Sequence, residues 1–241
     1  MGSHGKALRE RGGSICIIRG SGDVCPMGKR KQKAPEPTRA VGPHNLMLAA
    51  VKGAKAKASR KKWGAAARSY EKALHMARRL RAAELIAELA EKAGGARARN
   101  SEYEKAGENY LEGAHILGSF ASGNGIRAVR ESSRLFDLAG DAYRKAGKLF
   151  KAGNSYGHAG LVLRENGLDV EKGMKFHERA IEVFEAAEKL EGRCTDGDML
   201  YKWGNWARTL SEHHSGRMVS EDWAEKAREA GRRLSRLQRR E

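Results

Sequence analysis

The sequence predicts an all-α protein in which antiparallel helical hairpins stack side by side as a solenoid. Three observations lead to this fold class. All four prolines of the chain lie in residues 1–43, so residues 44–241 contain none. Apolar residues recur at the i, i+3, i+4, i+7 spacing of a helix, without the sustained alternation of strands. One short pattern of large and small residues recurs along this stretch, as expected for stacked repeats.

The chain is expected to divide into a disordered basic tail at 1–43 and a helical-repeat domain at 44–241. Every aromatic residue lies at or beyond Trp63, so the tail has no large side chain to bury. A segment of this kind does not recover its conformational entropy through packing.

Turn and capping signals divide the domain into about nine helices. The clearest breaks are the loop at 122–125, Gly147 between two closely spaced helices, and Asn166 with Gly167. Ser101 and Glu104 are expected to form a capping box. The expected helices span 44–60, 62–80, 81–97, 100–117, 126–146, 148–165, 168–190, 196–214 and 219–239.

The recurring pattern has four positions: a large residue at i, a small residue at i+3, an aromatic residue at i+7 and a second small residue at i+10. These spacings place all four side chains on one helical face, where small residues let a neighbouring helix approach. An ordinary helical bundle with alanine-rich contacts is the alternative. The copies are Trp63, Ala66, Tyr70 and Ala73; Tyr103, Ala106, Tyr110 and Gly113; Phe136, Ala139, Tyr143 and Ala146; Leu149, Ala152, Tyr156 and Ala159; and a degenerate Val170, Gly173, His177 and Ala180.

Residues 136–159 resemble a tetratricopeptide repeat. The residues similar to its first helix are Phe136, Ala139, Gly140 and Tyr143. Those similar to its turn and second helix are Gly147, Leu149, Ala152, Tyr156 and Ala159. The segments 139–147 and 180–184 also resemble the SNAP branch, the soluble attachment proteins of membrane fusion. The resemblance implies a right-handed TPR/SNAP-like solenoid and an adaptor that binds proteins or peptides. Trp63 and Tyr103 lie 40 residues apart, longer than the family's period of about 34 residues.

Charge is distributed unevenly along this basic chain of net charge +17. Residues 1–44, 45–99 and 226–241 are basic, whereas residues 100–225 are mildly acidic. Three interpretations stay open: a solvated surface, an acidic partner that includes another copy of the chain, and nucleic acid or an anionic membrane surface. The cations of the third interpretation are Lys55, Lys57, Arg60, Lys61, Lys62, Arg232, Arg233, Arg236, Arg239 and Arg240.

The expected function is a non-enzymatic scaffold or adaptor that binds a protein or peptide on its helical-repeat surface. Its partner is expected to carry acidic groups, because the candidate contacts suit carboxylates or backbone carbonyls. A basic accessory protein that binds RNA, DNA or ribosomes without sequence specificity is the alternative. The candidate binding residues are Arg144, Lys151, Asn154, His158, Lys202 and Asn205.

No set of residues points to catalysis, a metal ion or a cofactor. Cys194, His213 and His214 carry no nucleophile or metal-ligand pattern, and no phosphate-binding loop is evident. No apolar run approaches the length of a transmembrane helix. The three cysteines suit a reducing compartment, so a cytoplasmic protein is expected.

Overall fold

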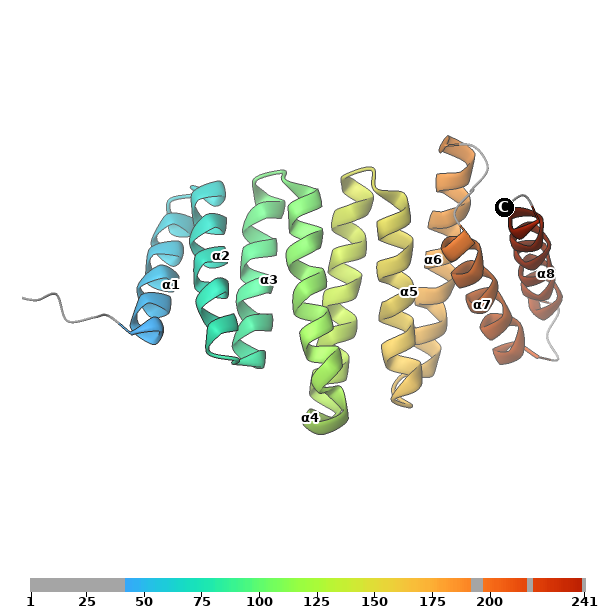
Figure 1. The fold of residues 1–241 in the computed structure, drawn as a ribbon, viewed down its shortest axis with the longest axis horizontal. Helices are drawn as coiled ribbons and strands as arrows, with labels where there is room; N and C mark the ends of the chain where they lie inside the picture. Colours follow the sequence, from blue (N-terminus) through green and yellow to red (C-terminus); the bar gives the residue numbers. More distant parts are fainter. Residues whose placement is uncertain (1–41, 192–196, 216–218, 240–241) are drawn as a thin grey trace, which may run out of the picture. The chain divides into compact units, whose positions relative to one another are not determined.

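The structure is a computed structural model and describes residues 42–191, 197–215 and 219–239. These residues form helices and turns without a strand. The expected tail lies outside the described residues except for Gly42 and Pro43. The helices are α1 (Pro43–Ser59), α2 (Trp63–Arg79), α3 (Ala83–Arg99), α4 (Tyr103–Lys145), α5 (Leu149–Glu165), α6 (Val170–Glu191), α7 (Gly197–His213) and α8 (Val219–Gln238) (Figure 1).

Helix α4 consists of two helices that meet at Gly125. Gly125 has φ 72° and ψ −170°, a conformation open to glycine and strained for other residues. The expected break is therefore confirmed at Gly125, whereas the loop expected at 122–124 is wrong because these residues continue the first half of α4. With α4 counted as a first half before Gly125 and a second half after it, the described residues form nine helices, as the sequence predicted.

Uniform helices and turns explain the 40-residue period of the sequence. Helices α1, α2, α3 and α5 each contain 17 residues, and three residues separate α1 from α2, α2 from α3, and α3 from α4. One helix and one turn therefore occupy 20 residues, and a hairpin occupies 40. A helix of this length spans about 25 Å.

Each of these turns places its middle residue in the left-handed region. The φ angles are 55° at Lys61, 53° at Arg81 and 60° at Ser101, with 72° at Gly147 in the turn after α4. In the first turn the amide of Lys62 donates to the carbonyl of Lys57 at 3.0 Å. This 6→1 hydrogen bond, with its neighbour from Lys61 to Ala58, satisfies the free carbonyls at the end of α1.

The expected capping box at Ser101 and Glu104 is wrong. Ser101 takes the left-handed conformation and ends α3, with its amide donating to the carbonyl of Ala98 at 3.0 Å. Helix α4 begins at Tyr103 without a side-chain cap on its first turn. The turn geometry therefore takes precedence over the local capping preference of serine.

Alternate helices contact one another and form two layers. The first layer contains α3, the second half of α4, α6 and α8. It is linked by Arg134 to Glu91 at 2.7 Å and by Lys226 to Glu185 at 2.6 Å. The second layer contains α2, the first half of α4, α5 and α7. Its links run from Arg78 to Glu112, from Lys151 to Glu104 and from Arg164 to Thr209.

Glycines receive aromatic rings where consecutive helices cross. A Cβ added at Gly94 or Gly107 would lie 2.8 Å from the ring of Tyr110 or Tyr143, respectively. The other rings in such positions are Tyr156 at Gly140 and Phe184 at Gly153, and Trp206 of α7 packs in the same way on Gly157 of α5, an alternate helix. Close packing of this kind holds α3 to α7 in a continuous core.

The residues of the recurring pattern lie mostly in the core. Trp63, Tyr103 and Leu149 are half-buried. The buried members are Ala66, Tyr70, Ala73, Ala106, Tyr110, Gly113, Phe136, Ala139, Tyr143, Ala152, Tyr156, Ala159, Gly173, His177 and Ala180. Gly140, which belongs to the tetratricopeptide resemblance, is also buried.

Candidate functional site

Arg144 and Lys151, two of the candidate binding residues, lie exposed near carboxylates. Lys151 donates to Glu104 Oε1 at 2.8 Å, and its ammonium group lies 5.4 Å from the ring centroid of Tyr143. The guanidinium of Arg144 lies 3.9 Å from Asp141. These carboxylates offset part of the positive charge that was expected to attract an acidic partner.

The other four candidates lie on neighbouring helices of the second layer. Asn154 and His158 are on α5, and Lys202 and Asn205 are on α7, where Trp206 packs against Gly157 of α5. All four are half-buried, and the Oδ1 atom of Asn154 has no hydrogen-bond partner. The structure therefore brings these four together and leaves Arg144 in the other layer.

His158 belongs to an aromatic cluster. Its ring stacks on Phe136 at 5.4 Å and meets His115 edge-on at 5.9 Å. Burial lowers the pKa of His158, and the charges of His115 and Lys202 lower it further. The imidazole is therefore neutral at pH 7 and can act as a hydrogen-bond partner for an uncharged group.

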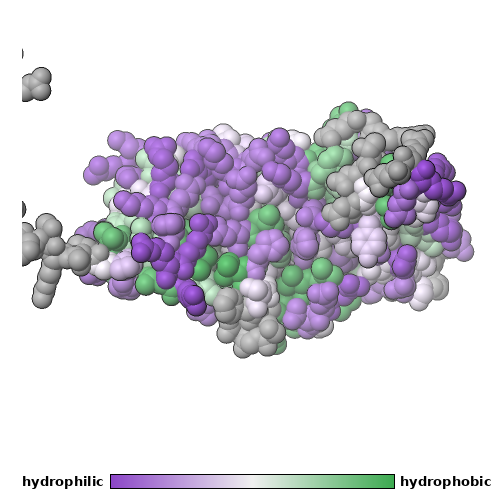
Figure 2. All heavy atoms as spheres, in the orientation of Figure 1, coloured by the Kyte–Doolittle hydropathy of each residue, from purple (hydrophilic) through white to green (hydrophobic). Residues whose placement is uncertain are grey.

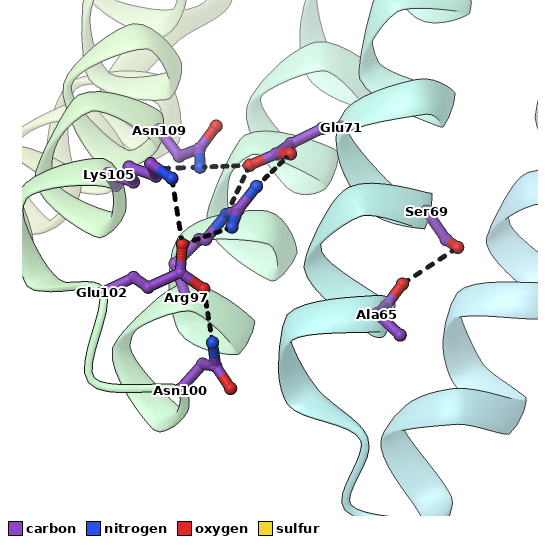
Figure 3. A network of polar contacts seen from close by, with 8 residues as sticks. All are labelled: Ala65, Ser69, Glu71, Arg97, Asn100, Glu102, Lys105 and Asn109. Carbon is purple, nitrogen blue, oxygen red and sulfur yellow. Dashed lines mark hydrogen bonds and ion pairs between the residues drawn. The ribbon is translucent and has the colours of Figure 1, made fainter.

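A buried arginine joins α2, α3 and α4. Arg97 is 7% exposed and binds both carboxylate oxygens of Glu71, at 2.7 and 2.6 Å, and Glu102 at 2.5 Å (Figure 3). Asn109 donates to Glu71 at 3.3 Å. The hydrogen bonds from Arg97 hold the pKa of Glu71 below its ordinary value. Because these charges satisfy one another, the network is structural.

A second arginine network connects α4 to α6 in the first layer. The guanidinium of Arg179 lies 4.0 Å from the ring centroid of Tyr156 and donates to Asp137 at 2.8 Å and Asp141 at 2.6 Å. The Tyr156 hydroxyl also donates to Asp141 at 2.7 Å. Burial raises the pKa of Tyr156, and the hydrogen bond to Asp141 raises it further.

A hollow of about 400 Å³ lies between α3 and the second half of α4, in the first layer. Its walls combine small and aliphatic residues with a rim of carboxylates. The apolar residues are Ala87, Leu117, Ala128 and Leu135, and the charged residues are Glu84, Glu88, Glu91, Glu131 and Arg127.

Cations pair with three of the four carboxylates of the rim. Arg134 pairs with Glu91 at 2.7 Å and with Glu131 at 2.5 Å, and its hydrogen bond lowers the pKa of Glu131. Glu88 pairs with Lys92. In the described part of the chain no ion pair involves the fourth carboxylate, that of Glu84.

Sequence reasoning missed this hollow, although part of its signal was present. Glu84, Glu88 and Glu91 recur at the i, i+4, i+7 spacing of one helical face. The opposite wall comes from Arg127, Ala128 and Glu131, some 40 residues later in the chain. Only the packing of the second half of α4 beside α3 brings the two walls together.

No protein-family model and no curated protein matches this chain. Solved structures similar to it include the following three. A de novo designed helical repeat protein, DHR64, is 21% identical over 82% of this chain and 100% of its own, with a TM-score of 0.39. The DHF58 filament is 19% identical over 82% and 96% of the two chains, with a TM-score of 0.41. BtubC (BKLC) from P. vanneervenii is 16% identical over 81% and 82%, with a TM-score of 0.34.

The chain's own helices and contacts define it as an all-α helical-repeat protein. Within residues 42–191, 197–215 and 219–239, no helix has the length and apolar character needed to cross a membrane. Over the same ranges, no three His, Cys, Asp or Glu side chains are grouped as metal ligands.

Proposed function

We propose that this protein is a non-enzymatic, tetratricopeptide-like scaffold that binds a basic segment of a partner protein in the hollow between α3 and α4. The hollow is the observation that carries the proposal. Its apolar wall can bury the aliphatic stem of a lysine or arginine, while its carboxylates accept hydrogen bonds from the charged end. A cytoplasmic location, proposed from the reducing environment that the cysteines suit, is compatible with this role.

The charge of the partner differs from the sequence-based expectation. Arg144 and Lys151 predicted an acidic partner, whereas the hollow favours a basic one because Glu84, Glu88 and Glu131 line it. The candidate residues on α5 and α7 stay a proposed second contact surface of the same scaffold. The half-buried side chains of Asn154, Lys202 and Asn205 supply polar groups to this second surface.

The test uses a labelled peptide of alternating lysine and leucine residues and a matched peptide with glutamate in place of lysine. Fluorescence anisotropy should show binding of the lysine peptide alone. The substitutions Glu84→Gln and Glu88→Gln together should weaken that binding about tenfold, which corresponds to about 1.4 kcal/mol. The control Glu221→Gln with Asp222→Asn removes the same charge from the exposed start of α8.

The control should bind the lysine peptide as the natural sequence does. Equal weakening by both pairs would show a general charge effect and reject the hollow as the site. Binding of the glutamate peptide, lost on Lys202→Ala, would transfer the site to the α5–α7 surface. Circular dichroism of each variant confirms that helical content is unchanged.

A further inference from the structure

The first hairpin, α1 and α2 with the turns that follow them, concentrates positive charge. Residues 43–82 contain eleven lysines and arginines and a single carboxylate, Glu71, which Arg97 of α3 already binds. All eleven cations are exposed. Within the described residues, only Arg78 among them pairs with a carboxylate, that of Glu112 (Nε to Oε1, 2.6 Å).

Part of this charge forms a continuous stripe along α2. Arg68, Lys72, His75 and Arg79 are exposed at the i, i+4, i+7, i+11 spacing that places side chains on one face of a helix. The stripe extends about 16 Å, because each residue adds about 1.5 Å. Hydrophilic residues predominate over the upper part of α1 to α3 in the view of Figure 2.

The basic C-terminal helix differs in this respect. On α8, Arg232 binds Glu225 at 2.6 Å and Glu229 at 2.9 Å, and Arg228 binds Glu225 at 2.8 Å. Carboxylates on the same helix therefore offset much of its positive charge. The two basic regions that the sequence placed at the ends of the domain are thus not equivalent, and the first hairpin holds the uncompensated charge.

We propose that the α2 stripe binds the phosphate backbone of a nucleic acid without reading its sequence. Exposed lysines and arginines gain affinity by releasing counterions from such a backbone. The stripe presents cations and a histidine to solvent and no base-reading motif, so the contacts are with phosphates. This surface is separate from the hollow, and the inference goes beyond the proposed scaffold function.

Other occupants fit the stripe less well. A helix that lies on a membrane presents several large apolar residues beside its cations, whereas Leu80, at the end of α2, is the one large hydrophobic residue exposed between Arg68 and Arg81. The cores of protein interfaces are depleted of charged residues, and the stripe consists of three cations and a histidine. A second copy of the chain is repelled at long range, because each copy has a net charge of +17.

The test measures binding of the full chain to a fluorescein-labelled single-stranded RNA of mixed sequence between about 50 and 200 mM salt. The variant combines Arg68→Gln, Lys72→Gln and Arg79→Gln. Its matched control combines Arg228→Gln, Arg232→Gln and Arg236→Gln on α8, which removes the same number of positive charges. Both triple variants substitute exposed side chains, so circular dichroism should show unchanged helicity.

The α2 variant should raise the Kd about tenfold or more at about 100 mM salt. It should also reduce the slope of log Kd against log salt by about 2, since each phosphate contact on a single strand contributes about 0.7. The α8 control should change both quantities much less. Equal effects of the two variants, RNA binding that neither changes, or no binding at the lowest salt would overturn the inference. Tighter binding to phosphatidylserine vesicles than to RNA, lost in the α2 variant, would assign the stripe to membranes instead.

Discussion

The ring of Tyr156 occupies the space in which a side chain at position 140 would lie. A Cβ added at Gly140 would come closer than 3.0 Å to this ring, a separation that real Cβ atoms do not show. Tyr143, three residues after Gly140, in turn fills the corresponding space at Gly107. The second half of α4 therefore receives a ring from α5 and inserts its own into the first half of α4.

Replacing Gly140 by alanine should destabilise the fold by about 1–3 kcal/mol, because the added methyl group overpacks the contact with Tyr156. Urea unfolding followed by circular dichroism gives the change. The control is Gly231→Ala, where an added Cβ meets no atom within 4 Å in the interior of α8. That control should stabilise the protein by about 0.5–1 kcal/mol. Equal effects at the two positions would refute the packing argument.

The turn residues should respond in opposite directions to glycine and alanine. Arg81→Gly should raise the free energy of unfolding by about 1 kcal/mol, since Arg81 has φ 53° and glycine relieves the strain. Gly147→Ala should lower the free energy of unfolding by about the same amount, because alanine is strained at the φ of 72° there. An added Cβ meets no atom within 4 Å, so a clash does not add to this effect. Ala82→Gly, at φ −89°, is the control and should give no gain. A gain at Ala82 as large as at Arg81 would contradict this explanation.

Removing Arg97 should leave Glu71 partly buried without its partner. Arg97→Met is expected to cost roughly 2–3 kcal/mol, towards the low end for buried pairs because Glu71 is partly exposed. The double variant with Glu71→Met should recover much of this loss, and Arg99→Met, an exposed position, should cost less than about 1 kcal/mol. Additive losses in the double variant would show that the two residues do not interact.

The same network predicts a pH effect in the acidic range. The pKa of Glu71 is lowered in the folded protein, so its carboxylate binds a proton less readily in the folded state than in the unfolded state. Its contribution to stability is therefore fully present above the ordinary value of 4.5 and is lost as pH falls through the lowered value. Denaturant unfolding across this range should show a weaker acid dependence for Glu71→Gln.

His177 should destabilise the protein as pH falls below neutrality. Burial lowers its pKa to about 4 from 6.5, and its ring is 0% exposed and stacks on Trp206. Between these two values the unfolded chain binds the proton and the folded chain does not, so stability falls by up to about 3 kcal/mol from pH 6.5 to 4. His177→Leu should flatten this part of the profile. An unchanged profile in the variant would exclude His177 as the source.

Local chemistry made most of the helices predictable. The helix expected at 44–60 spans Pro43–Ser59, and the one expected at 148–165 spans Leu149–Glu165. Glycine at 125 and 147 identified two breaks correctly, because both positions require a positive φ. Ser101 misled the prediction, since a residue without glycine's freedom also adopts this conformation when the turn hydrogen bonds require it.

Contacts between residues far apart in the chain could not be predicted from the sequence patterns. Gly107 and Gly153 each precede a tyrosine by three residues, yet the partner ring of each comes from the next helix. Arg97 and Glu71 are 26 residues apart, so no helical spacing relates them. The binding surface depends on the same long-range packing, which places α3 beside the second half of α4.

The uniform turns also affect how such a chain can grow. The segment 63–102 comprises two helices of 17 residues and two turns of three, and α4 begins in the same backbone context as α2. A tandem duplication of this segment would enter the chain in register with the existing hairpins. The added unit would lengthen the array by one helix in each layer, about 10 Å at common interhelical distances, and would add a second copy of the α2 stripe. The number of basic stripes can therefore increase in whole units, while the second copy of α3 still forms the acidic hollow with α4.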